Sequence, residues 1–191
     1  MGIIMIIVAV LAIAIVFAVV IALWVMGIYN GLITLRNQIE NAWAQVDVQL
    51  KRRYDLIPNL VETVKGYAAH ERNTLENVIK ARQQCIDAKG LKDQAAAENM
   101  LTQTLRSIFA LSEAYPDLKA NTNFLALQEE LTATEGKIAY ARQFYNDSVV
   151  QYNTKKQVFP ANMVANFFAF PEKEYFELEE TAQRQAPKVT F

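Results

Sequence analysis

Residues 3–28 read IIMIIVAVLAIAIVFAVVIALWVMGI, a run of 26 consecutive apolar residues without a charged side chain. A helix rises 1.5 Å per residue, so this run would extend about 39 Å, whereas the hydrocarbon core of a bilayer is about 30 Å thick. The run is therefore long enough to cross a membrane with some tilt. We interpret residues 1–28 as a transmembrane anchor, which makes the lipid bilayer the first partner.

A cleaved secretory signal is the main alternative interpretation of this run. Such signals start with basic residues and contain an apolar stretch of about 7–15 residues. Here no Lys or Arg precedes the run, because the first basic residue is Arg36, and the run is much longer. A buried core helix is a second alternative, but small domains rarely bury so long an uninterrupted apolar segment. Both comparisons favour a retained span.

The basic residues beside the span predict its orientation. Cytoplasmic flanks are enriched in Lys and Arg. The N-terminal flank has none, whereas Arg36 and then residues 51–53 follow the span. We therefore expect a single-pass protein of the inner (cytoplasmic) membrane with its domain in the cytoplasm. Large domains are also translocated regardless of flanking charge, so an extracytoplasmic domain is the alternative.

Helical periodicity dominates the chain after the span. From Leu32 to Leu50, apolar residues recur every three or four positions, as on one face of an amphipathic helix. The segment Asp55–Pro58 interrupts this pattern, because proline disfavours a helical residue before it and suits the first turn of a new helix. We predict a turn there. One long helix kinked at Pro58 is the alternative, since the apolar spacing continues through the proline.

Three further helices follow from the same spacing: one ending near Gly90, one over about 93–114, and one over about 121–158 with Asn121 as its cap. Amphipathic helices joined by short loops form up-and-down bundles. The prediction is thus an all-α fold in which an N-terminal transmembrane helix continues into an up-and-down four-helix bundle in residues 29–158. Residues 159–191 form an aromatic-rich and acidic C-terminal tail that either packs on the bundle or docks a partner or the membrane surface.

Composition argues against several classes of function. The chain has 19 Lys and Arg against 20 Asp and Glu, and this balance lacks the basic field of a general nucleic-acid-binding protein. A single histidine, His70, and a single cysteine, Cys85, argue against a zinc site, an internal disulfide framework and a Ser-His-Asp triad. No two glycines stand close enough to form a phosphate-binding loop. We expect no enzyme activity, no cofactor, no metal site and no nucleic-acid partner.

Four charged residues fall on or beside the apolar seams of the predicted helices: Glu71, Arg82, Glu135 and Arg142. An unpaired charge is costly to bury, so charges at a seam should be paired. One interpretation is a proton-handling or catalytic carboxylate. The interpretation we favour is a set of structural ion pairs that fixes helix register, because no nucleophile or metal ligand accompanies them.

The cluster Lys51-Arg52-Arg53 is the densest basic segment of the chain. Basic clusters close to a membrane bind anionic lipids. These residues lie more than 20 positions beyond the apolar run, so we interpret them as a solvated helix end beside the predicted turn.

Two features of the span predict how it sits in the membrane. Trp24 and Tyr29 have the amphipathic rings that anchor a helix at the membrane–water interface. Ala14, Ala18 and Ala22 recur every four residues and so line one helix face, where small side chains allow close packing of helices in lipid. We expect this face to support a homo-oligomer. The alternative is that alanine is simply common in membrane helices.

Several segments together resemble one protein family. The chain is similar to the LemA family over nearly its whole length and in the same order, in Tyr29-Asn30, AWAQVDVQLKRR (42–53), DLIPNLVETVKGY (55–67), TEGKI (134–138), ARQFYN (141–146), YNT (152–154), Phe159-Pro160 and Phe176. The resemblance implies a single-span bacterial membrane protein with a helical bundle and no established catalytic site. Members are often associated with membrane-bound zinc proteases or envelope stress.

These observations lead to two hypotheses of function. The first is a non-enzymatic, membrane-anchored scaffold or adaptor that self-associates and presents its helical bundle near the membrane. The alternative is a regulatory or accessory partner of a membrane-bound protease.

Overall fold

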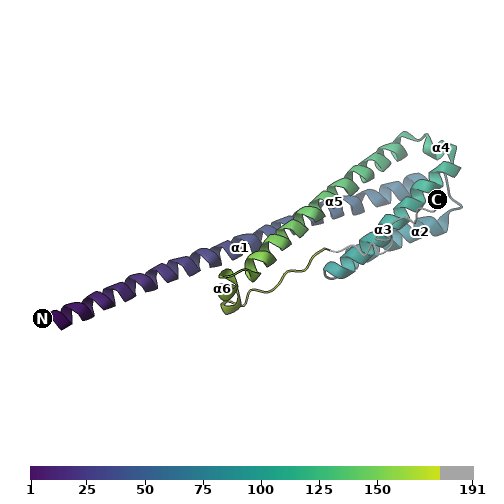
Figure 1. Ribbon diagram of the computed structural model, residues 1–191. Helices are drawn as coiled ribbons and strands as arrows, with labels where there is room; N and C mark the ends of the chain where they lie inside the picture. Colours follow the sequence, from purple (N-terminus) through teal and green to yellow (C-terminus); the bar gives the residue numbers. More distant parts are fainter. Residues whose placement is uncertain (177–191) are drawn as a thin grey trace, which may run out of the picture. The chain divides into compact units, whose positions relative to one another are not determined.

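The computed structural model describes residues 1–176, and they form an all-α chain (Figure 1). No strand occurs in this part of the protein, and the predicted fold class is confirmed. The helices are α1 (Gly2–Lys65), α2 (Arg72–Asp87), α3 (Leu91–Leu111), α4 (Pro116–Lys119), α5 (Thr122–Gln157) and α6 (Ala161–Phe167), with a 3₁₀ turn at Ser112–Ala114 between α3 and α4.

Helix α1 passes through Pro58 without a break, so the predicted turn at Asp55–Pro58 is wrong. A proline inside a helix removes one backbone hydrogen bond and costs about 3 kcal/mol. Burial outweighs that cost here, because Leu50 and Ile57 before the proline and Leu60 after it are at most 2 % exposed. The helix ends at Lys65 instead, and residues 66–71 form the turn before α2.

The contacts between residues divide the chain into two compact units. Unit 1 comprises Met1–Asn41 and Asp147–Lys173, and unit 2 comprises, among the described residues, Ala42–Asn146 and 174–176. The division expected from the sequence, into residues 1–28, 29–158 and 159–191, stays a prediction. Residues 177–191 of the expected tail lie outside the described residues.

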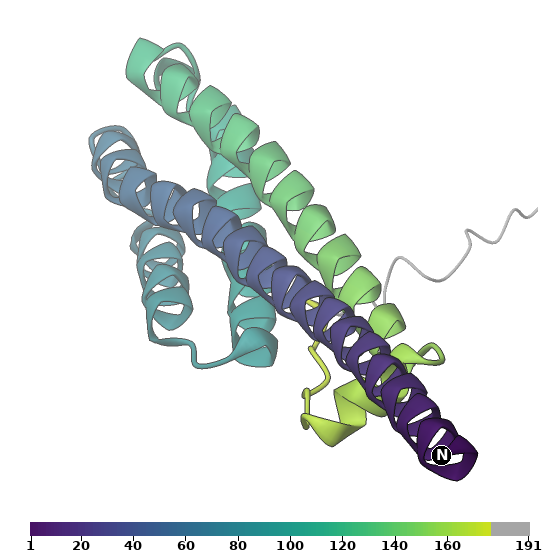
Figure 2. The ribbon, with the colours of Figure 1, turned by 90° about the vertical axis from the view of Figure 1, so that its left-hand side faces the viewer.

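Unit 2 is a helical bundle. Within it, α2 and α3 lie side by side (Figures 1 and 2), joined by a tight connection in which Gly90 has a φ of +89°, a conformation that glycine adopts without strain. Asn121 caps α5 as predicted, since its Oδ1 accepts a hydrogen bond from the backbone N–H of Phe124 at 2.9 Å. The largest fully buried apolar side chains of the main core cluster are Ile57, Leu60, Leu101, Ile108, Leu118 and Phe124.

Unit 1 holds the apolar half of α1. Every residue of α1 up to Trp24 is exposed, and Val25 is the first residue that is partly covered. Among the described residues, α1 is the one helix long and apolar enough to cross a membrane, judged by length and composition. The remainder of unit 1 is the end of α5, the short helix α6 and the extended chain that follows it. Helix α6 was not expected from the sequence.

Candidate functional site

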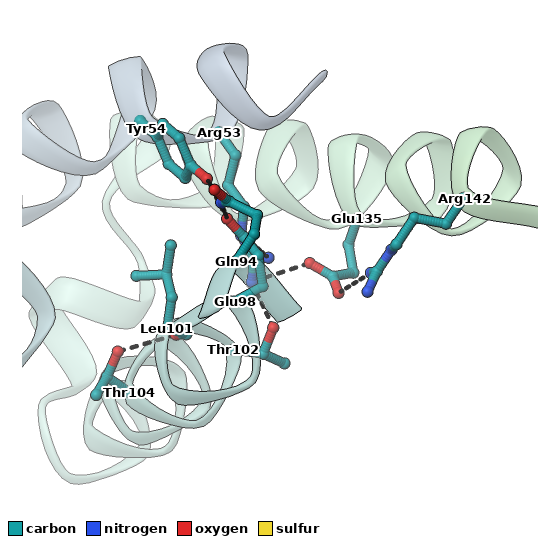
Figure 3. A network of polar contacts seen from close by, with 9 residues as sticks. All are labelled: Arg53, Tyr54, Gln94, Glu98, Leu101, Thr102, Thr104, Glu135 and Arg142. Carbon is teal, nitrogen blue, oxygen red and sulfur yellow. Dashed lines mark hydrogen bonds and ion pairs between the residues drawn. The ribbon is translucent and has the colours of Figure 1, made fainter. Parts of the chain in front are cut away.

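The strongest concentration of polar contacts in unit 2 surrounds Arg53 of α1 (Figure 3). Its guanidinium is 2 % exposed and donates to three groups: Nη1 lies 3.1 Å from Oε2 of Glu98, and Nη2 lies 2.7 Å from Oγ1 of Thr102 and 3.0 Å from Oε2 of Glu135. Glu98 and Thr102 come from α3 and Glu135 from α5. One buried arginine thereby joins three helices.

The carboxylate of Glu98 is 1 % exposed and has further donors. The hydroxyl of Tyr54 donates to Glu98 Oε1, and Gln94 Nε2 donates to the same oxygen at 3.0 Å. Burial first, and then the negative charge of Glu98, raise the pKa of the Tyr54 phenol above its ordinary range. The phenol therefore remains a hydrogen-bond donor, and the buried carboxylate is stabilised by charged and neutral donors together.

Glu135 extends this network toward solvent. It is 39 % exposed, and its Oε1 lies 3.9 Å from Nη2 of Arg142, whose guanidinium carbon lies 5.4 Å from the ring centre of Phe176. Two arginines and two glutamates thus form the charged part of the network. Because their charges balance and each is engaged, the arrangement is suited to fixing the register of α1, α3 and α5.

A cavity of about 200 Å³ adjoins this network, and Arg53, Thr102 and Glu135 form part of its lining. These three side chains already hydrogen bond or pair with one another through Arg53. Among residues 1–176, no group of three or more His, Cys, Asp or Glu side chains is placed to hold a metal ion. The geometry supports a structural role for the network.

Cys85 of α2 is the other candidate for reactive chemistry. The residue is 2 % exposed. Burial first, and then the charge of Glu98, raise the pKa of its thiol above the ordinary value. Since the thiolate is the nucleophilic form, a buried and protonated thiol is unreactive. Cys85 therefore serves as a small core residue.

Arg82 of α2 explains how α1 accommodates Pro58. In a regular helix the N–H of residue 58 would donate to the carbonyl of Tyr54, four residues earlier, but proline has no N–H. The Nε of Arg82 donates to that carbonyl oxygen at 2.8 Å. A side chain from another helix thus replaces the missing backbone donor, which keeps α1 continuous.

This substitution of donors gives a double-mutant test. Arg82→Ala should lower the free energy of unfolding by about 1–3 kcal/mol, because it leaves a partly buried carbonyl without a donor. Pro58→Ala restores the backbone N–H, so Arg82→Ala should cost clearly less in that background. Urea unfolding of the four proteins, followed by circular dichroism, measures the coupling. Equal costs in both backgrounds would contradict the assignment.

Two asparagines of α5 hold the extended chain after α6. In unit 1, Asn153 accepts from the backbone N–H of Lys173 at 3.1 Å and donates to its carbonyl at 2.9 Å. In unit 2, Asn146 makes the same pair of bonds with Phe176, at 2.8 and 3.1 Å. An asparagine side chain carries a carbonyl acceptor and an NH₂ donor group, so each asparagine satisfies the N–H and C=O of one residue in a segment that no strand pairs.

The sequence-predicted charged residues occupy different environments. Glu135 and Arg142 belong to the network described above. Glu71 accepts a hydrogen bond from the hydroxyl of Tyr115 at 3.3 Å, and Arg82 donates to a backbone carbonyl. The structure therefore brings two of the four together and gives the other two neutral partners.

The predicted membrane residues all lie in unit 1. Ala14, Ala18 and Ala22 are exposed on α1, and Trp24 is 46 % exposed. Tyr29 is partly covered by two rings of the chain beyond α5, with ring centres 4.9 Å from Phe168 and 5.5 Å from Phe170. Interface anchoring and oligomerisation by these residues stay predictions.

The central residues of the network were not predicted from the sequence. The interpretation of Arg53 as part of a solvated helix end is wrong, because Arg53 is buried, and Glu98 was not among the predicted charged residues. The signal was present in the spacing: Leu50, Arg53, Ile57 and Leu60 follow one another at intervals of three or four. Placing a turn at Asp55–Pro58 removed Arg53 from that seam.

Comparison with known proteins gives consistent results. The model of the LemA family matches residues 42–191. The protein LemA of Metamycoplasma hominis is 26 % identical, with 73 % of this chain and 64 % of that protein covered. The magnetosome protein MamQ 2 of Paramagnetospirillum magneticum and the magnetosome protein MamQ of Magnetospirillum gryphiswaldense are each 23 % identical, with 78 % of this chain and 64 % of the relative covered.

The chain thus spans less than two thirds of the length of the curated relatives that it matches. The family model covers well over half of the chain, including Arg53, Glu98, Glu135 and Arg142. The chain belongs to the LemA family.

Proposed function

We propose that this protein is a non-enzymatic, membrane-anchored scaffold or adaptor that presents its helical bundle near the bilayer. The observation that carries the proposal is the continuity of α1, a single helix from Gly2 to Lys65. Its first 24 residues are exposed and apolar, whereas Ile57, Leu60 and Val64 near its end belong to the bundle core. Membrane anchor and folded domain therefore share one element.

The chemistry of the bundle supports a binding role over catalysis. The buried charges of Arg53 and Glu98 are engaged with each other, and Cys85 is protonated and covered. An activated nucleophile or a poised acid–base pair would need the opposite arrangement, with a perturbed group open to substrate.

Self-association belongs to the same proposal. The exposed face of Ala14, Ala18 and Ala22 leaves the span without a packing partner in the described residues. In lipid, helices associate through close packing over small residues, and symmetric homo-oligomers are the usual product.

A bulky residue on this face should disrupt the oligomer. Ala18→Leu is expected to shift the particle in mild detergent to a smaller size, because leucine separates the backbones. Val19→Leu on a neighbouring face is the matched control and should leave the size unchanged. Light scattering after size exclusion measures both. A wild type and an Ala18→Leu variant of identical size would exclude this interface.

Affinity purification from crosslinked membranes tests the function itself. Crosslinks between copies of the chain support a scaffold, whereas recovery of a membrane protease in stoichiometric amount would replace the scaffold by the regulatory alternative.

The proposal places the bundle in the cytoplasm, because Arg36 follows the span and cytoplasmic flanks are enriched in basic residues. In intact spheroplasts, an impermeant thiol reagent should label the Gly2→Cys variant at position 2. Protection of that position would indicate the opposite orientation.

A further inference from the structure

The segment around α6 exposes an apolar stripe that folding does not explain. Residues 158–171 contain no charged side chain. Phe159, Met163 and Phe167 follow one another at intervals of four, and they are 78 %, 64 % and 83 % exposed. Met163 and Phe167 lie on the same side of α6, because positions four apart share one side of a helix, and Phe159 lies in the turn just before the helix begins.

The opposite side of this segment is already packed. Ala161, Val164 and Ala165 of α6 are at most 5 % exposed, and Phe170 is 8 % exposed. The segment therefore has apolar side chains on both sides. One side is buried in unit 1, and the other is exposed. Contiguous exposed apolar side chains of this kind mark an interaction surface.

Contacts within unit 1 locate the segment along α1. The rings of Phe168 and Phe170 pack against Tyr29, with centres 4.9 and 5.5 Å away. Tyr29 is the first residue after the 26-residue apolar run. Val25 and Ile28, the residues of α1 at which partial covering begins, lie inside that run. Unit 1 thus brings the segment beside the end of the span (Figures 1 and 2).

We propose that the stripe of Phe159, Met163 and Phe167 inserts into the headgroup–acyl boundary of the bilayer that α1 crosses. This inference rests on the proposed membrane anchoring and adds a second membrane contact to it. The end of the span is the level at which a bilayer changes from hydrocarbon to water, and apolar side chains on an otherwise polar domain settle at that boundary. Lys155 and Lys156 precede the stripe and supply positive charge for anionic lipid headgroups.

The bilayer fits this surface better than a second copy of the chain. A stable protein interface buries roughly 800 Å² on each partner, which is more than three side chains supply. The bilayer is instead present wherever the span is inserted, and contact with it requires no complementary shape. An interfacial segment held by Tyr29 would also fix the height and rotation of α1 in the membrane.

The test uses the full chain with Cys85→Ala, reconstituted in vesicles of mixed zwitterionic and anionic lipid. The substitution Phe167→Cys introduces a cysteine, to which a nitrobenzoxadiazole fluorophore is attached. Two matched sites serve as controls: Asn166→Cys, which is exposed on another face of α6, and Tyr140→Cys, which is 77 % exposed in unit 2. Resistance to alkaline extraction independently reports whether the span is inserted.

The expected result is a blue-shifted emission at position 167 and at least threefold stronger quenching by lipids with a shallow nitroxide than at position 140, with position 166 between them. Emission and quenching at position 167 equal to those at position 140, in protein that resists extraction, would overturn the inference and leave the anchoring intact. A blue shift without quenching by nitroxide lipids would assign the stripe to a second copy instead. Protein released by alkaline extraction would refute the anchoring and the inference together.

Discussion

Arg53→Ala is expected to lower the free energy of unfolding by about 3–5 kcal/mol, the cost typical of removing one partner from a buried ion pair. The guanidinium is 2 % exposed and lies against Glu98, which is 1 % exposed. Without it, the carboxylate of Glu98 loses its charged partner and keeps neutral donors such as Tyr54 and Gln94, and Thr102 and Glu135 lose a donor as well. Urea unfolding in mild detergent measures the loss, with Trp43 fluorescence reporting on unit 2.

The neighbouring Arg52 offers a matched control. Its Nη2 lies 2.7 Å from Oε1 of Glu130, but the two side chains are 49 % and 41 % exposed. Arg52→Ala should therefore cost no more than about 1 kcal/mol. Arg53→Lys should recover only part of the loss, because an ammonium lacks the planar fork that serves several acceptors. Similar losses for Arg52→Ala and Arg53→Ala would show that the buried network does not stabilise the fold.

Phe124→Ala should also lower the free energy of unfolding by about 3–5 kcal/mol, because truncating a buried phenylalanine leaves a cavity that its surroundings fill only in part. The side chain is fully buried at the start of α5, and its ring centre lies 6.4 Å from that of Phe109 in an edge-to-face arrangement. Since Phe124 belongs to the core cluster shared by α1, α2 and α3, its loss should affect the whole of unit 2.

Leu125 is the control for this second substitution, because it follows Phe124 in α5 and is 47 % exposed. Leu125→Ala should change the free energy of unfolding by about 0.5 kcal/mol or less. Both variants place an alanine in α5, so the difference between their free energies of unfolding reports mainly the loss of a buried side chain and not a change in helix propensity. A small loss for Phe124→Ala, comparable to that for Leu125→Ala, would mean that the core closes around the missing ring.

Local patterns predicted much of the architecture. The three- and four-residue spacing of apolar side chains indicated helices, and the start of α5 followed from Asn121, since a cap depends on residues next to it in the chain. The prediction failed at Pro58, where local chemistry favours a turn. The donor that compensates for the proline is Arg82, 28 residues after Tyr54, and no local pattern shows such a partner.

The sequence by itself determined the all-α class, the apolar run and the absence of a motif for phosphate binding, because these depend on composition and on spacing within a few residues. Only the tertiary structure decided that Arg53 is buried beside Glu98, 45 residues away, and that α6 packs one face while exposing the other. The reason is physical: burial depends on which segments meet in space, and one change in helix register or continuity moves a charged residue from solvent to the core.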